Sequence, residues 1–519
     1  MSNTKLSSFA ALDRRQFLSG TAALGTALIL PGGLHAQTPK AGGRFRMGLS
    51  EANSTDVLTP GAIVGSMTHL INGSIRNCLV ELSPSGELVP ELAESWETSD
   101  AKTWSFKIRS GVEFHNGKTL TPADVVYSLN LHRGEGTSSA GKSVMAAASD
   151  VKVDGDRVTV VLNQANVDFP SFLTDDNFVI VMDGATAEDL AAGGAGTGGY
   201  SVGRFNPGVD FVGVRNPNYW KEGRAHFDEI ELIGIPDPNA RMNALMGGQV
   251  DAINKPEDKT LALLAGAPGV KVASIPSMKH LIFAMRTDVA PFDNPDVRMA
   301  LKHAIDREAI LNTVLRGNGA LGNDQPIGPA NQFFDASIPL RTYDPEKAKF
   351  HLQKAGMSSL EVELSAADGA WAGAVDAATL YAEHAKAAGI NIKVAREPND
   401  GYWSNVWMKK PWFASWAAGR VSENLMMTLT YSADAKWNET FWKNDRFNEL
   451  LVASRAETDT KKRAEMMSEM QLLIRDDGGS VIPAFANWNL ALSDKIGHGE
   501  IAGQWDNDAR RCTERWWFA

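Results

Sequence analysis

The strictest alternation of apolar and polar side chains lies in residues 104–109, which read Trp-Ser-Phe-Lys-Ile-Arg. A period of two predicts a strand with one buried face. The Asn-Gly pair at 116–117 then predicts a turn. The run Thr-Pro-Ala-Asp at 121–124 is typical of a helix start, with a capping threonine, a proline at the first helical position and an acid in the first turn. Residues 104–130 are therefore predicted to form a strand, a turn and a helix in that order.

Other segments show either the period of two that is typical of strands or the period of 3.6 that is typical of helices. We expect a strand at 43–49, a helix leading into a strand at 68–80, a hairpin of 151–154 and 157–162 around Gly155, strand character at 200–218, a helix at 295–307, and a capped helix from Tyr343 that precedes a strand near Leu360. Mixed helices and strands of this kind predict an α/β protein.

Four stretches of the sequence, taken together, resemble those of a known protein family. They are TWSFKIRSGVEFHNGKTLTPADVVYSLN before residue 131, GTGGYSVGRFNPGVDFVGVRNPNYW at 196–220, PDVRMALKHAIDR at 295–307 and YDPEKA at 343–348. In this order they are similar to the bacterial family 5 extracellular solute-binding proteins, the peptide, opine and nickel receptors of ABC importers. The resemblance runs from about Gly43 to about Leu490, and it departs from the family at Gly199, where proline is usual. It implies a protein that captures a solute and is not an enzyme.

The resemblance also implies an architecture, the two-lobed periplasmic binding protein fold with an extra inserted domain and a hinge. Carried onto this chain, the first lobe takes 41–74, 200–281 and 480–519, the inserted domain takes 75–199, and the second lobe takes 282–479. The chain is then expected to cross between the lobes near 277–288 and 478–483, and these crossings would act as the hinge.

The first residues predict export. Residues 13–19, Asp-Arg-Arg-Gln-Phe-Leu-Ser, form a twin-arginine pattern, and the apolar run that follows to Leu30 is short and rich in Gly and Ala. We interpret residues 1–36 as a signal peptide read by the twin-arginine translocase, with cleavage after Ala36, and the mature protein as periplasmic. Its removal changes the formal net charge from −11 to −13, because three basic residues and one acidic residue are lost. Such an acidic protein is a poor nucleic-acid binder.

Length and cysteine content limit the number of domains and the kinds of metal site that the chain can form. A chain of 519 residues with 43% hydrophobic content is long enough for about three domains or two large lobes. Its two cysteines, Cys78 and Cys512, exclude metal sites built on cysteine spacing. In an oxidising periplasm they would form either a disulfide or two separate buried thiols.

Two nucleotide-binding motifs match by letter but not by context. Residues 136–143, GTSSAGKS, fit the phosphate-loop pattern, and residues 194–199, GAGTGG, fit a dinucleotide fingerprint. Both motifs require a preceding buried strand, whereas the segments before them are predicted to be helical. We interpret both as loops. HExxH and GxSxG motifs are missing and the histidines are scattered, so the sequence predicts no catalytic residues, no cofactor and no metal site.

We expect the ligand-binding site in the segment of the chain where tryptophan is most concentrated. Five of the 14 tryptophans fall between residues 403 and 437: Trp403, Trp407, Trp412, Trp416 and Trp437. Indole rings suit the walls of a pocket for varied organic groups. The alternative for each is a core role in the second lobe, which we expect for about three of the five; the binding candidates, weighed against that alternative, are Trp403, Trp416 and Trp437.

The residues after Trp416 bear on the ligand's charge. Peptide-binding relatives carry there an aspartate that holds the ligand's α-amino group, whereas residues 417–424 of this chain contain none. Arg420 offers instead a planar fork for a carboxylate, phosphate or sulfonate. Glu423 would receive an ammonium group if it points inward, and an internal salt bridge between Arg420 and Glu423 is the alternative.

Four further residues are candidates from their positions: His280 at the predicted hinge, Asn72 in an early helix of the first lobe, Trp371 in a loop of the second lobe, and Asn438 beside Trp437. For each of them a structural role is at least as well supported.

The sequence thus predicts a monomeric periplasmic receptor that hands a peptide-like or opine-like, carboxylate-bearing solute to an ABC permease and ATPase complex. The alternatives are a periplasmic peptide-binding chaperone or sensor, an enzyme exported by the twin-arginine route, and a metal-chelate receptor.

Overall fold

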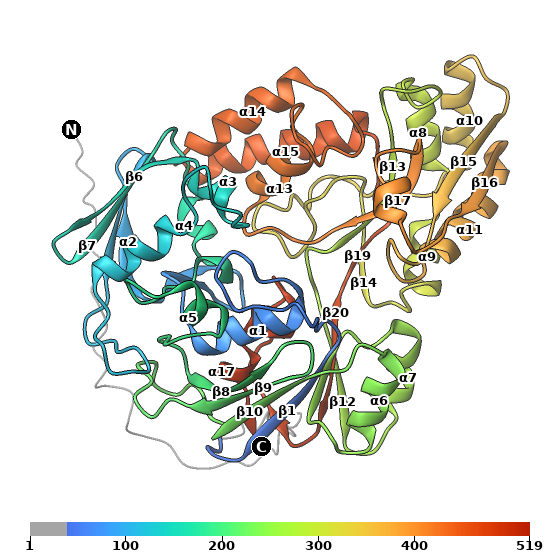
Figure 1. Cartoon of the computed structure of the whole chain (residues 1–519). Coiled ribbons are helices and arrows are strands. Elements are labelled where there is room, and N and C mark those ends of the chain that lie inside the picture. The colour runs from blue at the N-terminus through green and yellow to red at the C-terminus, as the bar shows by residue number, and fades with distance from the viewer. Residues whose placement is uncertain (1–38) are drawn as a thin grey trace, which may run out of the picture. The chain divides into compact units, whose positions relative to one another are not determined.

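The computed structural model describes residues 39–519, so the predicted signal peptide at 1–36 lies outside the described residues. Strands in the described part form two seven-stranded sheets, a four-stranded sheet and two small two-stranded sheets. Helices alternate with the strands along the chain (Figure 1). The predicted α/β class is confirmed.

The first large sheet has the order β12-β20-β11-β1-β10-β9-β8. Its strands are β1 (Arg44–Leu49), β8 (Tyr200–Asn206), β9 (Asp210–Arg215), β10 (Glu229–Gly234), β11 (Ala252–Asn254), β12 (Val270–Ile275) and β20 (Trp488–Ser493). β1 runs parallel to both β10 and β11. Helices α1 (Gly65–Ile75), α6 (Pro238–Met246) and α7 (Leu261–Ala265) contact this sheet. Its core includes Phe45, whose ring stacks on Phe227 with centroids 4.7 Å apart.

The four-stranded sheet, β4-β5-β7-β6, contains the segment with the strictest alternation. Its strands are β4 (Ala93–Glu97), β5 (Thr103–Ile108), β6 (Ala148–Asp154) and β7 (Arg157–Leu162). The apolar residues of β5 are buried, as the period of two predicts. Helix α2 (Pro122–Asn130) begins at the predicted proline, and Asp124 accepts hydrogen bonds from the backbone N–H and hydroxyl of Thr121 at 2.8 and 2.7 Å. The helix start was therefore predicted correctly, and a reciprocal capping box stabilises it.

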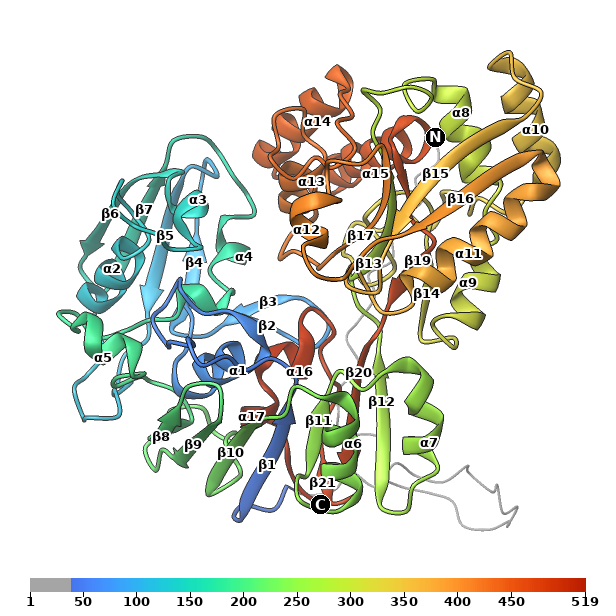
Figure 2. The same cartoon turned by 45° about the vertical axis from the view of Figure 1, so that its right-hand side comes forward.

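The second large sheet has the order β14-β19-β13-β17-β15-β16, and β18 also pairs with β13. Its strands are β13 (His280–Met285), β14 (Gly319–Leu321), β15 (Leu360–Ala366), β16 (Ile390–Arg396), β17 (Trp412–Ala417), β18 (Ser480–Val481) and β19 (Ala484–Ala486). The helices α8 (Pro295–His303), α9 (Arg307–Thr313), α10 (Pro345–Lys354) and α11 (Ala374–Ala385) belong to the same lobe. Figure 2 shows β15, β16 and β17 side by side. The predicted helices near 295 and 345 and the strand near Leu360 are confirmed.

A helical cluster lies between β17 and β18 in the sequence. It consists of α13 (Glu423–Thr430), α14 (Asp445–Ala456) and α15 (Thr460–Asp477), which share a core around Met427, Phe447 and Ile474. Before β17 a short helix, α12 (Tyr402–Asn405), carries the first residues of the tryptophan-rich segment.

The chain crosses twice between the two large sheets. The first crossing is the stretch 276–279 between β12 and β13, which overlaps the start of the expected segment 277–288. The second is Asn487, which separates β19 from β20, so the expected crossing at 478–483 is wrong by several residues. Residues 480–486 were assigned to the first lobe, but they pair with β13 and β14 of the second sheet. Short apolar strands give no sequence signal that tells one sheet from the other.

Both nucleotide motifs occupy loops. Residues 136–143 follow helix α2 and lead into a four-residue helix, α3 (Lys142–Met145), instead of joining a buried strand to a long helix. In the other motif, a Cβ atom on Gly196 would lie 1.9 Å from the Ile75 carbonyl oxygen, and one on Gly198 would lie 2.4 Å from the Ile75 carbonyl carbon. These glycines allow the loop to pack on the end of α1, which explains the glycine spacing without a nucleotide.

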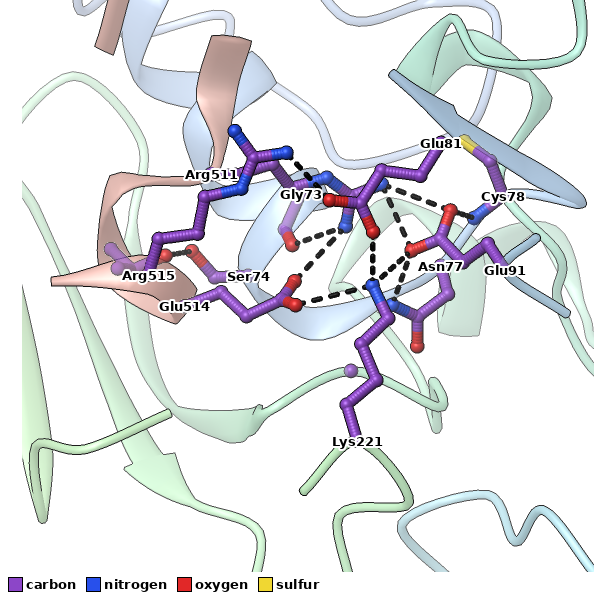
Figure 3. A network of polar contacts seen from close by, with 12 residues as sticks. Gly73, Ser74, Asn77, Cys78, Glu81, Glu91, Lys221, Arg511, Glu514 and Arg515 are labelled. Atoms are coloured by element: carbon purple, nitrogen blue, oxygen red, sulfur yellow. Dashed lines mark hydrogen bonds and ion pairs between the residues drawn. The ribbon is translucent and has the colours of Figure 1, made fainter. Parts of the chain in front are cut away.

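A buried ionic network ties the C-terminal segment to the hairpin of β2 (Val80–Leu82) and β3 (Leu88–Pro90) (Figure 3). The Lys221 ammonium lies 2.5 Å from Glu81, 2.9 Å from Glu91 and 3.1 Å from Glu514. Arg511 and Arg515 of the C-terminal segment add ion pairs of 3.2 Å to Glu91 and 2.5 Å to Glu81. Burial alone would raise the pKa of Glu81, but Lys221 and the two arginines hold it well below its usual range.

The two cysteines lie in different surroundings and are both free, buried thiols. Cys78 Sγ faces the Asp175 carbonyl oxygen at 3.5 Å, whereas Cys512 Sγ lies 3.9 Å from Met47 Sδ. Of the two alternatives, the structure therefore has separate thiols. The link between the early chain and the C-terminus is made by the ionic network.

Replacing Lys221 by methionine tests this network. The substitution leaves three buried carboxylates without their shared cation, so we expect the free energy of unfolding to fall by about 3–5 kcal/mol. Urea unfolding followed by circular dichroism measures the change. The matched control is Lys152→Met on the exposed face of β6, where the ion pair with Asp150 spans 3.6 Å and both side chains are more than half exposed. Equal losses in the two variants would contradict the assigned role of the network.

Candidate functional site

A cavity of about 260 Å³ opens on the second lobe, beside the end of β17. Its lining comes from β13, from β17 and the loop after it, from α12 and the turn after it, from the end of α13 and the loop that follows, and from β18. The lining residues are His280, Ile282, Trp403, Trp407, Ser415, Trp416, Ala417, Ala418, Arg420, Thr430, Tyr431, Trp437, Glu439, Thr440 and Ser480. We call it the tryptophan cavity.

The antiparallel pairing of β13 with β17 builds one side of the tryptophan cavity. His280 lies opposite Ala417, and Ile282 lies opposite Ser415. Because successive side chains of a strand point to opposite faces, these alternate positions present their side chains on the same face of the sheet. The register therefore brings His280, at the end of the first crossing, next to the segment that leads to Arg420.

Four of the five clustered tryptophans line the cavity. Trp403 and Trp407 contact each other edge to face, with ring centroids 6.1 Å apart. Trp403, Trp416 and Trp437 keep 44%, 36% and 49% of their surface exposed. Only Trp412 is fully buried in the sheet core, where it packs on Phe292 and Tyr381. The expectation that about three of the five are core residues was too high, because much of this indole surface faces a cavity.

Arg420 lines the cavity without a carboxylate partner among residues 39–519. Its guanidinium donates to the carbonyl oxygens of Ala418 and Gly419, both at 3.0 Å, and lies 5.8 Å from the centre of the Trp437 ring. Burial lowers its pKa, although Asp175 of the inserted domain acts in the opposite direction, and the group remains a cation. The alternative of a salt bridge with Glu423 is wrong, since no such pair is present in the described chain.

Glu439 is the carboxyl group that shares this cavity, and the sequence reasoning missed it. It accepts a hydrogen bond of 2.7 Å from the indole N–H of Trp407. Burial raises the pKa of Glu439 to about 7, against hydrogen bonds from Ser415 and Trp407 that lower it. Within residues 39–519 no lysine, arginine or histidine forms an ion pair with it. The feature of the sequence that could have indicated Glu439 as a site residue is its position two residues after Trp437.

His280 adds a second acceptor. The side chain is fully buried, and its Nδ1 lies 3.2 Å from the carbonyl oxygen of Met278. Since a carbonyl only accepts, Nδ1 carries the proton. Burial, together with nearby Arg420, lowers the pKa of His280 to about 4, so the ring is neutral at pH 7. Its Nε2 is then an acceptor, and it has no hydrogen-bond partner in the described part of the chain.

A second cavity of about 470 Å³ adjoins the first and shares Arg420 and Trp437 with it. Its other walls come from the first lobe and the inserted domain: Ile63, His69, Ala140, Gly141, Ser143, Val144, Phe172, Asp175, Asn177, Phe178, Trp505 and Arg510, with Val421, Leu425 and Leu429 from the second lobe. The two cavities therefore form one cleft whose walls belong to both lobes.

The remaining predicted site residues lie outside the tryptophan cavity. Glu423 is buried at the start of α13, accepts from the Phe333 backbone N–H at 3.3 Å and lines a third cavity together with Arg420. Asn438 is buried and donates to the carbonyl oxygens of Ser432 and Trp442 at 3.2 and 2.7 Å. Trp371 packs in the core with its ring 6.0 Å from Phe283, and Asn72 is buried in α1 beside Arg76. The contacts of Asn438, Trp371 and Asn72 support structural roles.

Across residues 39–519, no group of three or more His, Cys, Asp or Glu side chains is arranged to hold a metal ion. The same residues contain no helix with the length and apolar character needed to span a bilayer.

Two lobes joined by two crossings, with a cleft between them lined by unpaired polar groups and indole rings, define a solute-binding protein. The model of the bacterial extracellular solute-binding proteins, family 5, matches residues 87–439, and the chain belongs to this family. The resemblance found in the sequence is thereby confirmed.

Relatives differ in their named cargo. Heme-binding protein A of Haemophilus influenzae is 31% identical over 323 residues, which cover 57% of this chain and 58% of that protein. A probable peptide ABC transporter periplasmic-binding protein of Sinorhizobium fredii is 27% identical, covering 75% of this chain and 76% of its own. Among solved structures, the ABC transporter substrate-binding protein CtaP of Listeria monocytogenes has a TM-score of 0.81 at 20% identity, covering 92% of this chain and all of the other.

The raised pKa of Glu439 predicts a pH-dependent stability. The folded protein holds this proton up to about pH 7, whereas the unfolded chain releases it near pH 4.5. The unfolding free energy therefore falls as pH rises from about 4.5 to about 7. Because glutamine cannot ionise, we expect Glu439→Gln to be more stable than the wild type by about 3 kcal/mol at pH 8 and about equal to it at pH 4.

Urea unfolding of the ligand-free protein at both pH values measures this difference. Glu361→Gln, on the exposed side of β15, is the matched control and should show no such pH-dependent gain. A Glu439→Gln variant that is less stable than the wild type at pH 8 would contradict the assigned environment of this carboxyl group.

Proposed function

We propose that this protein is a periplasmic receptor of an ABC importer that captures a carboxylate-bearing, peptide-like or opine-like solute and delivers it to the membrane permease. The observation that carries the proposal is Arg420, a half-buried guanidinium that lines the cleft and has no carboxylate partner in the described chain. A desolvated cation without a counter-ion costs free energy, and an anionic ligand would compensate for that cost.

The geometry of Arg420 favours a planar acid. The hydrogen bonds to Ala418 and Gly419 both involve Nη1, so Nη2 and Nε remain available. Two parallel N–H groups match the two oxygens of a carboxylate, and the same fork accepts a phosphate or a sulfonate. The segment 417–424 offers no aspartate for a peptide α-amino group, which supports an opine or another modified amino acid beside ordinary peptides as cargo.

The named cargo of the relatives supports a broad ligand class. One relative is named for heme and another for peptides. Heme and many peptides carry carboxylates, so one arginine in the cleft is compatible with either kind of cargo. The tryptophan cavity, at about 260 Å³, is close to the lower end of the usual range for small-molecule pockets.

Closure of the lobes would couple binding to transport. A solute on Arg420 also faces Asp175, Phe178 and Trp505 across the adjoining cavity. A ligand that contacts both walls binds the closed state more tightly and shifts the population toward it. We propose that the crossings at 276–279 and Asn487 form the hinge, that export uses the twin-arginine translocase, and that the receptor acts as a monomer.

Arg420→Ala tests the proposal. We expect binding of a carboxylate-bearing solute to weaken by about 1.5–3 kcal/mol, because charge-assisted hydrogen bonds are lost. A thermal-shift panel of dipeptides and opines, each paired with its primary carboxamide, identifies the responsive acids, and calorimetry then measures their affinities. Arg396→Ala, at the exposed end of β16, is the control. Unchanged affinity in Arg420→Ala, or amides that bind as well as their acids, would remove Arg420 from the site.

A further inference from the structure

The tryptophan cavity holds two acceptors that the protein leaves without a cation. Among residues 39–519, the groups that donate hydrogen bonds to Glu439 are neutral: the indole N–H of Trp407 and the side chain of Ser415. The Nε2 atom of His280 is buried and has no partner in the described residues. Both belong to the lining of one cavity. A partly buried carboxyl group and a buried acceptor nitrogen both gain when a donor reaches them.

The walls of the cavity also favour a positive charge. Trp403, Trp407, Trp416 and Trp437 line it with indole rings, and Tyr431 adds a fifth aromatic ring. The faces of aromatic rings attract cations, and tryptophan does so most strongly. Trp416 already shows this property, because the Lys279 ammonium lies 5.4 Å from the centre of its ring.

The protein's own cations are engaged elsewhere. Lys279 is placed between Trp416 and Trp488, at 5.4 and 5.5 Å from their ring centres. Arg420 donates to its own loop and lies over Trp437. Lys410, after α12, lies 3.7 Å from Glu397. An arginine and a glutamate thus line the same cavity without pairing with each other, which leaves opposite charges for a ligand to meet.

We infer that the tryptophan cavity receives a hydrogen-bond-donating cation of the solute, a primary ammonium or a guanidinium, between the indole rings and against Glu439 and His280 Nε2. This inference rests on the proposed function and narrows its substrate class: the solute carries a basic group as well as the acidic group bound by Arg420. Glu439 is then the residue that selects basic over neutral solutes. Glu423, the carboxyl group expected from the sequence to hold an ammonium, lies outside this cavity.

Matched dipeptides test the inference. N-acetyl-Ala-Arg is compared with N-acetyl-Ala-citrulline, which replaces the guanidinium by a neutral urea of the same size, and N-acetyl-Ala-Lys with N-acetyl-Ala-norleucine. Acetylation removes the α-ammonium group, so only the side chain of the basic member carries a positive charge. We expect the wild type to bind each basic member at least about tenfold more tightly than its neutral counterpart, as measured by calorimetry at pH 8. In Glu439→Gln this preference should fall to within about twofold, while the neutral members keep their affinity.

Two further variants separate this inference from the proposed function. Arg420→Ala should weaken both members of a pair alike, because both carry the same carboxylate. Glu361→Gln should leave the preference intact. A wild type that does not prefer the basic members, or that binds none of the four dipeptides, overturns the inference, and so does a Glu439→Gln variant that keeps the preference. If neutral acids still bind in an Arg420-dependent manner, the proposed function stands without it.

Discussion

The candidate site depends on the antiparallel pairing of β13 with β17. Their register sets His280 beside Ala417 and Ile282 beside Ser415, and the chain then continues from β17 directly to Arg420. One strand begins immediately after a crossing between the lobes, so the same backbone hydrogen bonds that shape the cavity also connect it to the expected hinge. A ligand that contacts this pair therefore acts where a relative movement of the lobes would begin.

The charged groups of the cleft are unpaired among the described residues, whereas buried charged groups in two other regions form ion pairs. Around Lys221, three carboxylates and two arginines compensate each other in a buried network. Between the inserted domain and the second lobe, Asp168 pairs with Arg463 at 2.5 Å. Arg420 and Glu439 have no such partners among the described residues, although both are partly withdrawn from water. This contrast is the physical basis for assigning them to a ligand instead of to the fold.

Local signals in the sequence predicted much of the fold and only part of the site. The alternation in β5, the capping residues of α2 and the proline-led helices α8 and α10 all depend on short-range chemistry, and each was predicted correctly. The second crossing was misplaced because it depends on which sheet the short strands β18 and β19 join. Of the candidate site residues, five line one cavity: Trp403, Trp416, Arg420, Trp437 and His280. Glu439 was missed because its burial and its contact with Trp407 arise only from tertiary packing.

We expect the cleft to bind one organic solute through opposite charges on Arg420 and Glu439. Native mass spectrometry of the protein purified from periplasm, followed by identification of the molecule released on denaturation, tests it most directly. A ligand at 100 times its dissociation constant adds about 2.7 kcal/mol to the folded state, so a tightly bound solute survives purification. The expected result is one equivalent of a solute that carries both an acidic and a basic group. A stoichiometric ligand with neither group, or a bound redox cofactor, would contradict it.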